Sequence, residues 1–395
     1  MLAGRQNRFG LNPVSLDRTV VGVIVGIVLL LGMTYSLTGF PVVIDYSPVL
    51  ERGVFPDVIH ERATAWEAIW GDPYRPVGEI LEDHGYTGQG GEVSPRPPSA
   101  LLLQTPLVLI PQGALMPVVT IAILLLLTWI GWLVHTISGV EPWKLLWTLP
   151  LVIISLPIVA TLSYSPLFGV LSVALLLASW RYQDRPWAGI LLGLSAALRL
   201  WPGLVIIGFW IAGRRSLAYK AVATFLVVSF AALLLPGVEL GASIASLLEA
   251  ESNWLNHNMN SSLALVLSPY GVPAFAAIGV ASVFGLFAAN RNRAYAVPIT
   301  IIAGLIAASL SWPTYALAAV PVAALYARTR SPVPILVMAV PVAFWSLLPS
   351  KWFGHLHFVA LLMLLILVSQ SRTLDLRRSA VPEARHIVIS GPPRP

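Results

Sequence analysis

Cysteine is absent from this chain of 395 residues. Its absence excludes disulfide bonds, thiolate nucleophiles and metal sites built on cysteine, and leaves the redox compartment unspecified. Charge is also scarce, because Asp, Glu, Lys and Arg together make up only 11% of the residues. Soluble domains carry about twice that share. Most of the surface of this protein is therefore not built to face water.

Apolar residues dominate the composition. They make up 57% of the sequence, and the mean hydropathy is +0.79. We predict an all-α, polytopic transmembrane bundle of about 10–12 membrane segments, with short interfacial helices in an extracytoplasmic first loop. The apolar runs lie at 19–40, 113–137, 144–163, 165–181, 217–236, 263–288, 294–311, 313–327, 333–348 and 355–371.

The stretch from Trp187 to Gly213 is interrupted at Arg199 and flanked by basic residues on both sides. We interpret it as a hairpin of two short helices whose tip points outward; a single kinked span is the alternative. With the hairpin, all but six of the 24 Lys and Arg residues are cytoplasmic. The six exceptions are Arg52, Arg62, Arg75, Arg96, Arg199 and Lys351.

This topology predicts a multi-pass protein of the cell membrane with both termini cytoplasmic. The tails are 1–18 and 372–395, the membrane domain is 19–371, and the first extracytoplasmic loop is 41–98. The net charge of +6 then reflects orientation and contact with anionic lipid, and indicates no nucleic-acid partner.

Polar residues gather on the predicted outer face. Ten of the 18 acidic residues lie between Asp45 and Glu92, in the first loop. Arg199 is the hairpin tip, and later outer loops carry polar clusters near Asn256, Ser311 and His355. Segments far apart in sequence thus converge on one side of the membrane, as a single interfacial site requires.

Four motifs in this order resemble glycosyltransferase family 87, whose members are polytopic GT-C-type enzymes. An Asp that opens an amphipathic helix is followed by a Gly and a Pro-Tyr pair, at Asp57, Gly71 and Pro73-Tyr74. The later elements are Arg199-Leu-Trp-Pro, Asn260-Ser-Ser and Ser311-Trp312. The chain departs from the family pattern where Thr314 and Tyr315 replace a histidine pair. The resemblance implies transfer of a sugar, mannose first and arabinofuranose second, from a polyprenyl-phosphate carrier to a glycolipid or cell-envelope glycan.

Such a transfer needs a carboxylate to accept a proton and a cation to hold phosphate. We predict Asp57 as the catalytic base, with a helix cap as its alternative role. Arg199 and His60 are predicted to bind the donor phosphate, and an internal salt bridge is the alternative for Arg199. The predicted substrate and acceptor contacts are Glu61, Arg96, Asn256, His257, Asn260, Ser311, Trp312 and Tyr315.

The remaining expectations concern surfaces and partners. Ala65, Trp66, Ile69 and Trp70 recur at helical spacing, which indicates either contact with the bilayer surface or packing against the bundle. We expect no cofactor and no metal, because His355 and His357 lack a third ligand. The partners expected are the lipid-linked sugar, the acceptor and membrane lipids. A transporter or flippase, or an assembly factor for lipid-linked intermediates, is the alternative function.

Overall fold

The structure, a computed structural model, describes residues 57–86, 96–139, 166–254, 260, 262–308, 311, 313–329 and 353–370. Every regular element in these ranges is a helix, and no strand occurs among them. The predicted all-α bundle is thereby confirmed. The predicted spans at 19–40, 144–163 and 333–348, and both predicted tails, lie outside the described residues.

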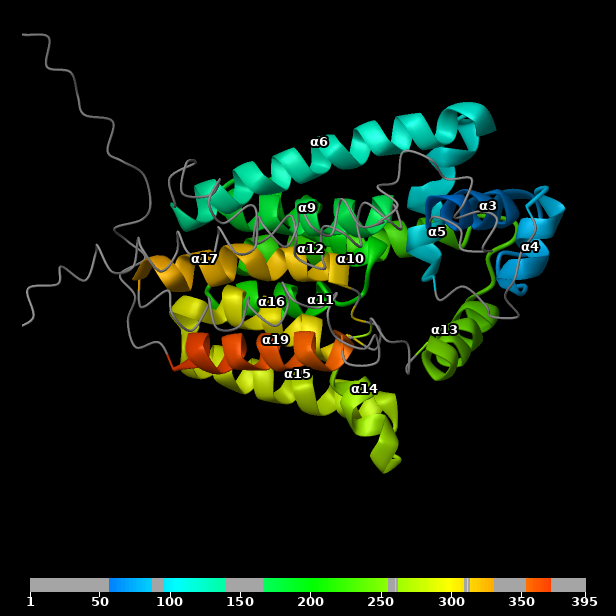
Figure 1. Cartoon of the computed structure of the whole chain (residues 1–395). Coiled ribbons are helices and arrows are strands. Elements are labelled where there is room, and N and C mark those ends of the chain that lie inside the picture. Colours follow the sequence, from blue (N-terminus) through cyan, green and yellow to red (C-terminus); the bar gives the residue numbers. More distant parts are fainter. Residues whose placement is uncertain are drawn as a thin grey trace, which may run out of the picture.

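The body of the protein is a bundle of apolar helices that lie side by side (Figure 1). Three helices of the described part, α6, α12 and α15, are long and apolar enough to cross a membrane. Shorter apolar helices share one buried core with them, so the long helices are not isolated spans. The bundle consists of α6 (Gln112–Ser138), α9 (Leu167–Arg181), α10 (Ala188–Leu198), α11 (Gly203–Ile211), α12 (Arg215–Ala232), α15 (Ala274–Arg291), α16 (Ala296–Ala307), α17 (Val320–Thr329) and α19 (Phe353–Ser369).

The chain turns back at Arg199, which confirms the predicted hairpin. Helices α10 and α12 run in the same direction, since Gly189 lies against Leu217 and Gly193 lies against Ala221. A Cβ at Gly189 would stand 2.6 Å from a carbonyl oxygen of α12, so only glycine allows this close approach. Because α10 and α12 are parallel, α11 between them must run in the opposite direction.

Three predicted continuous runs are broken in the structure. The run at 263–288 divides into α14 (Leu263–Leu267), η2 (Ser268–Tyr270) and α15. Pro269 and Pro273 lack the N–H that a helix interior needs, and Gly271, with a φ of +72°, ends η2 in the left-handed conformation. The runs at 294–311 and 313–327 likewise begin as 3₁₀ turns, η3 (Arg293–Tyr295) and η4 (Pro313–Ala319), before α16 and α17.

A cap of short helices covers the end of the bundle where the hairpin tip lies. It contains α3 (Asp57–Trp70), α4 (Val77–Asp83), α5 (Pro98–Gln104), η1 (Thr105–Leu109) and α13 (Leu240–Trp254). Figure 1 shows α3, α4, α5 and α13 together at this end. A second apolar cluster joins the cap to the bundle, with Val58 and Ile59 of α3 packed among residues that include Phe168 and Leu198.

The residues of α3 that recur at helical spacing do not all face the same way: some pack against the bundle and others lie at the surface. Ala65 is fully buried, whereas Trp66 and Trp70 are 37% and 61% exposed. The two indole rings contact each other, with centroids 4.3 Å apart. The helix therefore packs on the bundle through its small residues and keeps its large aromatic residues at the surface.

Candidate active site

Helix α3 brings two carboxylates to its buried side. Asp57 is the first helical residue and Glu61 follows one turn later, so both lie on one face. The side chain of Glu61 is completely buried. Val58, Ile59 and Ala63 anchor the helix in the apolar cluster beneath the cap. The acid pair is thus fixed by the packing of its own helix.

Arg96 fixes α3 from the other side. Its Nη1 donates a 2.9 Å hydrogen bond to the carbonyl oxygen of His60 and also donates to Oγ1 of Thr64. Thr64 in turn donates to the same carbonyl at 2.7 Å. Arg96 is buried, and Ser99 of α5, three residues later, donates to the carbonyl of Ala197 near the hairpin tip. Arg96 therefore clamps the backbone of the acid-bearing helix while its charge stays close to both acids.

Arg199 reaches the acids from the hairpin. It follows α10 in an extended conformation, and its Nη2 lies 3.6 Å from Oε1 of Glu61. A reciprocal pair of buried hydrogen bonds between Ser172 and Ser195 sets the register of α9 against α10 and so positions this tip. The internal ion pair expected as the alternative role of Arg199 is present, and its partner is Glu61.

Tyr315 covers the other face of Arg199. The guanidinium carbon lies 5.9 Å from the centroid of the Tyr315 ring, and the ring of Trp201 lies 6.1 Å from Tyr315. Within the described residues, Nε of Arg199 and Nε1 of Trp201 are buried and donate to no acceptor. The hairpin tip thus holds buried N–H groups that an incoming anion can use.

Burial dominates the titration of the acids. It raises the pKa of Asp57, and the positive charges of Arg96 and Arg199 oppose this shift. Burial likewise raises the pKa of Glu61 to about 7, again opposed by the two arginines, while the charge of Asp57 raises it further. A carboxyl that titrates near neutrality is suited to proton transfer.

His60 is neutral in the folded protein at physiological pH. Burial, and secondarily the charge of Arg96, lowers its pKa to about 3. It can therefore offer a donor phosphate a hydrogen bond but not a positive charge. The predicted phosphate contacts by His60 and Arg199 both remain predictions, and of the two residues only Arg199 carries a positive charge.

Asn260 joins two of the predicted motifs. Its Oδ1 accepts hydrogen bonds from the backbone N–H of Ser262 at 3.2 Å and of Ser311 at 3.0 Å. Asn260 and Ser311 are both buried. Asn260 thereby holds the segment that leads into η4, which carries Tyr315. The predicted contacts Asn256, His257 and Trp312 lie outside the described residues.

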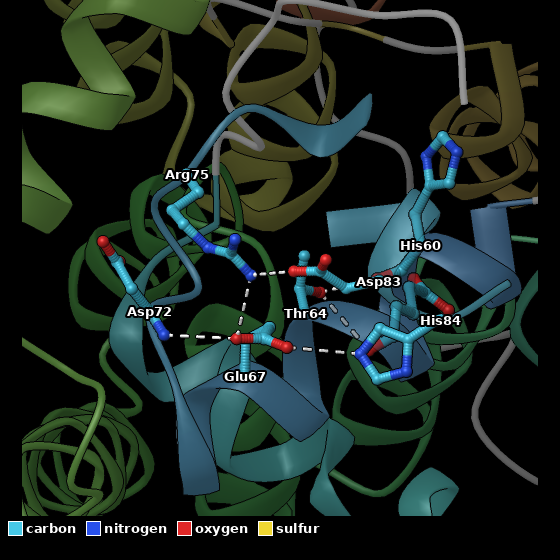
Figure 2. Close-up of polar contacts among 8 residues, drawn as sticks. His60, Thr64, Glu67, Asp72, Arg75, Asp83 and His84 are labelled. Atoms are coloured by element: carbon cyan, nitrogen blue, oxygen red, sulfur yellow. Dashed lines mark hydrogen bonds and ion pairs between the residues drawn. The ribbon is translucent and has the colours of Figure 1, made fainter. Parts of the chain in front are cut away.

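A second polar network closes the cap next to the acids (Figure 2). Arg75 bridges Glu67 at 3.3 Å and Asp83 at 2.8 Å, and Nε2 of His84 lies 3.3 Å from Oε1 of Glu67. In Figure 2 the ring of His60 points away from this network. These contacts tie the end of α3 to α4 and are satisfied among themselves, so the network is structural.

Sequence reasoning missed some of these roles. The sequence predicted that Asp57 begins a helix, but the shared face of Asp57 and Glu61 was not predicted and the pairing of Glu61 with Arg199 had no sequence signal. The tilted ring contact between Trp201 and Tyr315 had only a weak sequence signal, the aromatic residue inside the Arg199-Leu-Trp-Pro motif. Within the described ranges, no group of three His, Asp or Glu side chains could hold a metal ion.

Comparison with known proteins gives one match. The model of the family described as glycosyltransferase family 87 matches residues 96–348, which is more than half of the chain. Neither a curated protein nor a solved structure matches the chain. The matched range includes Arg96, Arg199, Asn260 and Tyr315, whereas Asp57 and Glu61 precede it.

Proposed function

The chain belongs to glycosyltransferase family 87, and on that premise we propose that it is an inverting transferase whose donor is a polyprenyl-phosphate sugar. Mannose is the first candidate for the sugar and arabinofuranose the second. The acceptor is a glycolipid or a cell-envelope glycan at the extracytoplasmic face. Because several helices are apolar and the family is a transferase family, the enzyme works at a membrane, and we propose the cell membrane with both termini cytoplasmic.

One observation carries this proposal. Two carboxylates one turn apart, the half-buried Asp57 and the buried Glu61, meet two arginines, the buried Arg96 and the half-buried Arg199, at one end of an apolar bundle. The acids supply a proton acceptor, and the hairpin tip supplies a cation with unused N–H groups. A lipid-borne phosphate can reach this end from the bilayer, since the cap sits where the bundle ends (Figure 1).

The arrangement supports a single displacement. The acceptor hydroxyl attacks the anomeric carbon of the sugar on the face opposite the phosphate, and Asp57 takes the hydroxyl proton. The bond between the anomeric carbon and the phosphate oxygen breaks, and the polyprenyl phosphate leaves with one more negative charge. The guanidinium of Arg199 stabilises that charge through its planar pair of donors. One inversion at the anomeric carbon follows.

The test supplies purified enzyme or membranes with radiolabelled polyprenyl-phosphate mannose and polyprenyl-phosphate arabinose, and identifies the labelled product. We expect Asp57→Asn to lower sugar transfer about 100- to 10,000-fold, because general-base catalysis contributes that much. Asp72→Asn is the matched control. Asp72 is an exposed acid of the same region whose Oδ1 accepts from the N–H of Tyr74, a contact that Asn preserves.

Two results would count against the assignment in different ways. Normal transfer by Asp57→Asn together with an inactive Glu61→Gln or Glu67→Gln would move the base to another acid. If the wild type consumes no polyprenyl-phosphate sugar at all, the proposed donor class is wrong.

A further inference from the structure

Glu61 forms an ion pair with Arg199, the residue that is proposed to bind the phosphate of the donor. Its Oε1 lies 3.6 Å from Nη2 of Arg199, which is a long contact for an ion pair whose carboxylate is fully buried. No side chain of the described residues donates a hydrogen bond to the carboxylate of Glu61. Among backbone groups, the amide of Phe168 at the start of α9 favours its ionised form. Arg199 is therefore held, but weakly held, by a partner that a phosphate can replace.

From this contact, and resting on the proposed function, we infer that Glu61 is an exchangeable counter-ion. The phosphate of the lipid-linked donor displaces Glu61 from Arg199, and Glu61 takes up one proton as the donor binds. Glu61 is thus a positioning residue: it keeps Arg199 in place before the donor arrives and releases it to the phosphate afterwards.

Charge balance requires the proton. When all are ionised, Asp57, Glu61, Arg96 and Arg199 sum to zero. A phosphodiester donor adds one negative charge to this buried group, and an uncompensated buried charge is strongly unfavourable. Taking one proton from solvent restores neutrality. Glu61 is the acid that loses its cation in the exchange, so it is the acid that becomes protonated.

The surroundings of Glu61 allow this protonation. The charged and titratable groups that face it are Asp57 on its own helix, Arg96 before α5, Arg199 on the hairpin and Tyr315 on η4. With Arg199 in place, the pKa of Glu61 is raised by burial to about 7. Removing that cation raises the pKa further, so Glu61 becomes neutral at physiological pH.

The test measures binding of farnesyl methyl phosphate, a phosphodiester that has no ionisable proton in the working range. Affinity is measured between about pH 6 and pH 8.5 in detergent, and calorimetry in two buffers of different ionisation enthalpy counts the protons taken up. For the wild type we expect binding to weaken up to about tenfold per pH unit above about pH 7, with uptake approaching one proton per ligand.

Three variants assign the proton. Glu61→Gln carries a neutral side chain of the same shape, so its binding should be tight and independent of pH, with no proton uptake. Asp57→Asn removes a negative charge that raises the pKa of Glu61, so its pH dependence should move to lower pH and weaken without disappearing. Glu79→Gln, which changes an exposed glutamate of α4, is the matched control and should behave as the wild type does.

Several results would overturn the inference. The inference would be wrong if the wild type bound the phosphodiester with an affinity independent of pH, or without taking up a proton. This test does not require Glu61→Gln to fold. If the affinity of Glu61→Gln still fell with rising pH while that of Asp57→Asn did not, the proton would belong to Asp57 instead. If either result came with normal sugar transfer, the displacement of Glu61 by phosphate would be wrong, but the proposed transferase function would stand. If the wild type bound no phosphodiester and consumed no lipid-linked sugar, the proposed function would fail with it.

Discussion

Replacing Arg199 tests both its charge and its shape. Its side chain is 17% exposed, and its partner Glu61 is fully buried. Removal of one member of a buried ion pair typically costs about 3–5 kcal/mol, because the other charge is left unpaired. Glu61 can avoid most of that cost by taking a proton. The destabilisation of Arg199→Ala should therefore depend on pH.

The magnitude follows from the pKa of Glu61. In the wild type the folded-state pKa is raised from 4.5 to about 7, so stability is lost as pH rises through that interval. Without Arg199 the folded pKa lies higher, and the loss continues above pH 7. Each pKa unit corresponds to about 1.4 kcal/mol. The extra loss through Glu61 at pH 8 is on the order of 1 kcal/mol, and at pH 6 it is close to zero.

Catalysis should suffer more than stability. Loss of charged hydrogen bonds to phosphate costs about 1.5–3 kcal/mol, or roughly 10- to 150-fold in kcat/KM for the lipid donor. Arg199→Lys should recover only part of this, since an ammonium lacks the planar pair of donors. The assays are donor kinetics, and thermal unfolding in detergent at pH 6 and pH 8.

The control is Arg214→Ala at the opposite end of the bundle, where Arg214 pairs with Asp184 at 2.6 Å. This partner is exposed, so the change should leave donor kinetics unaltered and shift stability little. The reasoning is refuted if Arg199→Ala folds well, uses the donor as the wild type does, and melts with no added pH dependence. Arg199 would then have a structural role only.

Two further predictions concern residues beside the acids. The pKa of His60 is lowered by burial to about 3, so between about pH 6.5 and pH 3 the unfolded chain binds a proton that the folded protein excludes. His60→Gln should therefore melt progressively higher relative to the wild type as pH falls from 7.5 to 4.5, and a constant difference in melting temperature would contradict this. Asn260→Ala should leave the buried N–H groups of Ser262 and Ser311 without their acceptor and lower the free energy of unfolding by about 1–3 kcal/mol. Denaturant or thermal unfolding measures the loss, and an unchanged stability would show that Asn260 is not a clamp.

Composition and local patterns were sufficient for the architecture. Apolar runs predicted the bundle helices to within a few residues, as at α6 and α9, because burial in lipid demands continuous apolar helices. The basic flanks of the stretch at 187–213 predicted that α10 and α11 reverse direction at Arg199. The runs that broke, such as 263–288, did so at prolines and glycines that the hydropathy pattern does not weigh.

The candidate site was predicted only in part. The sequence indicated that Asp57, Arg199 and the later motifs share one end of the protein. It could not indicate that Glu61 pairs with Arg199, that Arg96 clamps the backbone of α3, or that Asn260 holds Ser311. The alternative of an internal ion pair for Arg199 was open, but its partner was not specified.

The sequence by itself determined the membrane class of this protein, the helices and the acidic first loop, because those follow from hydropathy, charge and period along a local stretch of chain. Only the tertiary structure decided which acid meets which arginine. Glu61 and Arg199 are far apart in the sequence, and they meet because α3 packs across the start of α9 and the end of α10. That packing also buries Glu61, and burial beside a displaceable cation gives this carboxyl a pKa near neutrality.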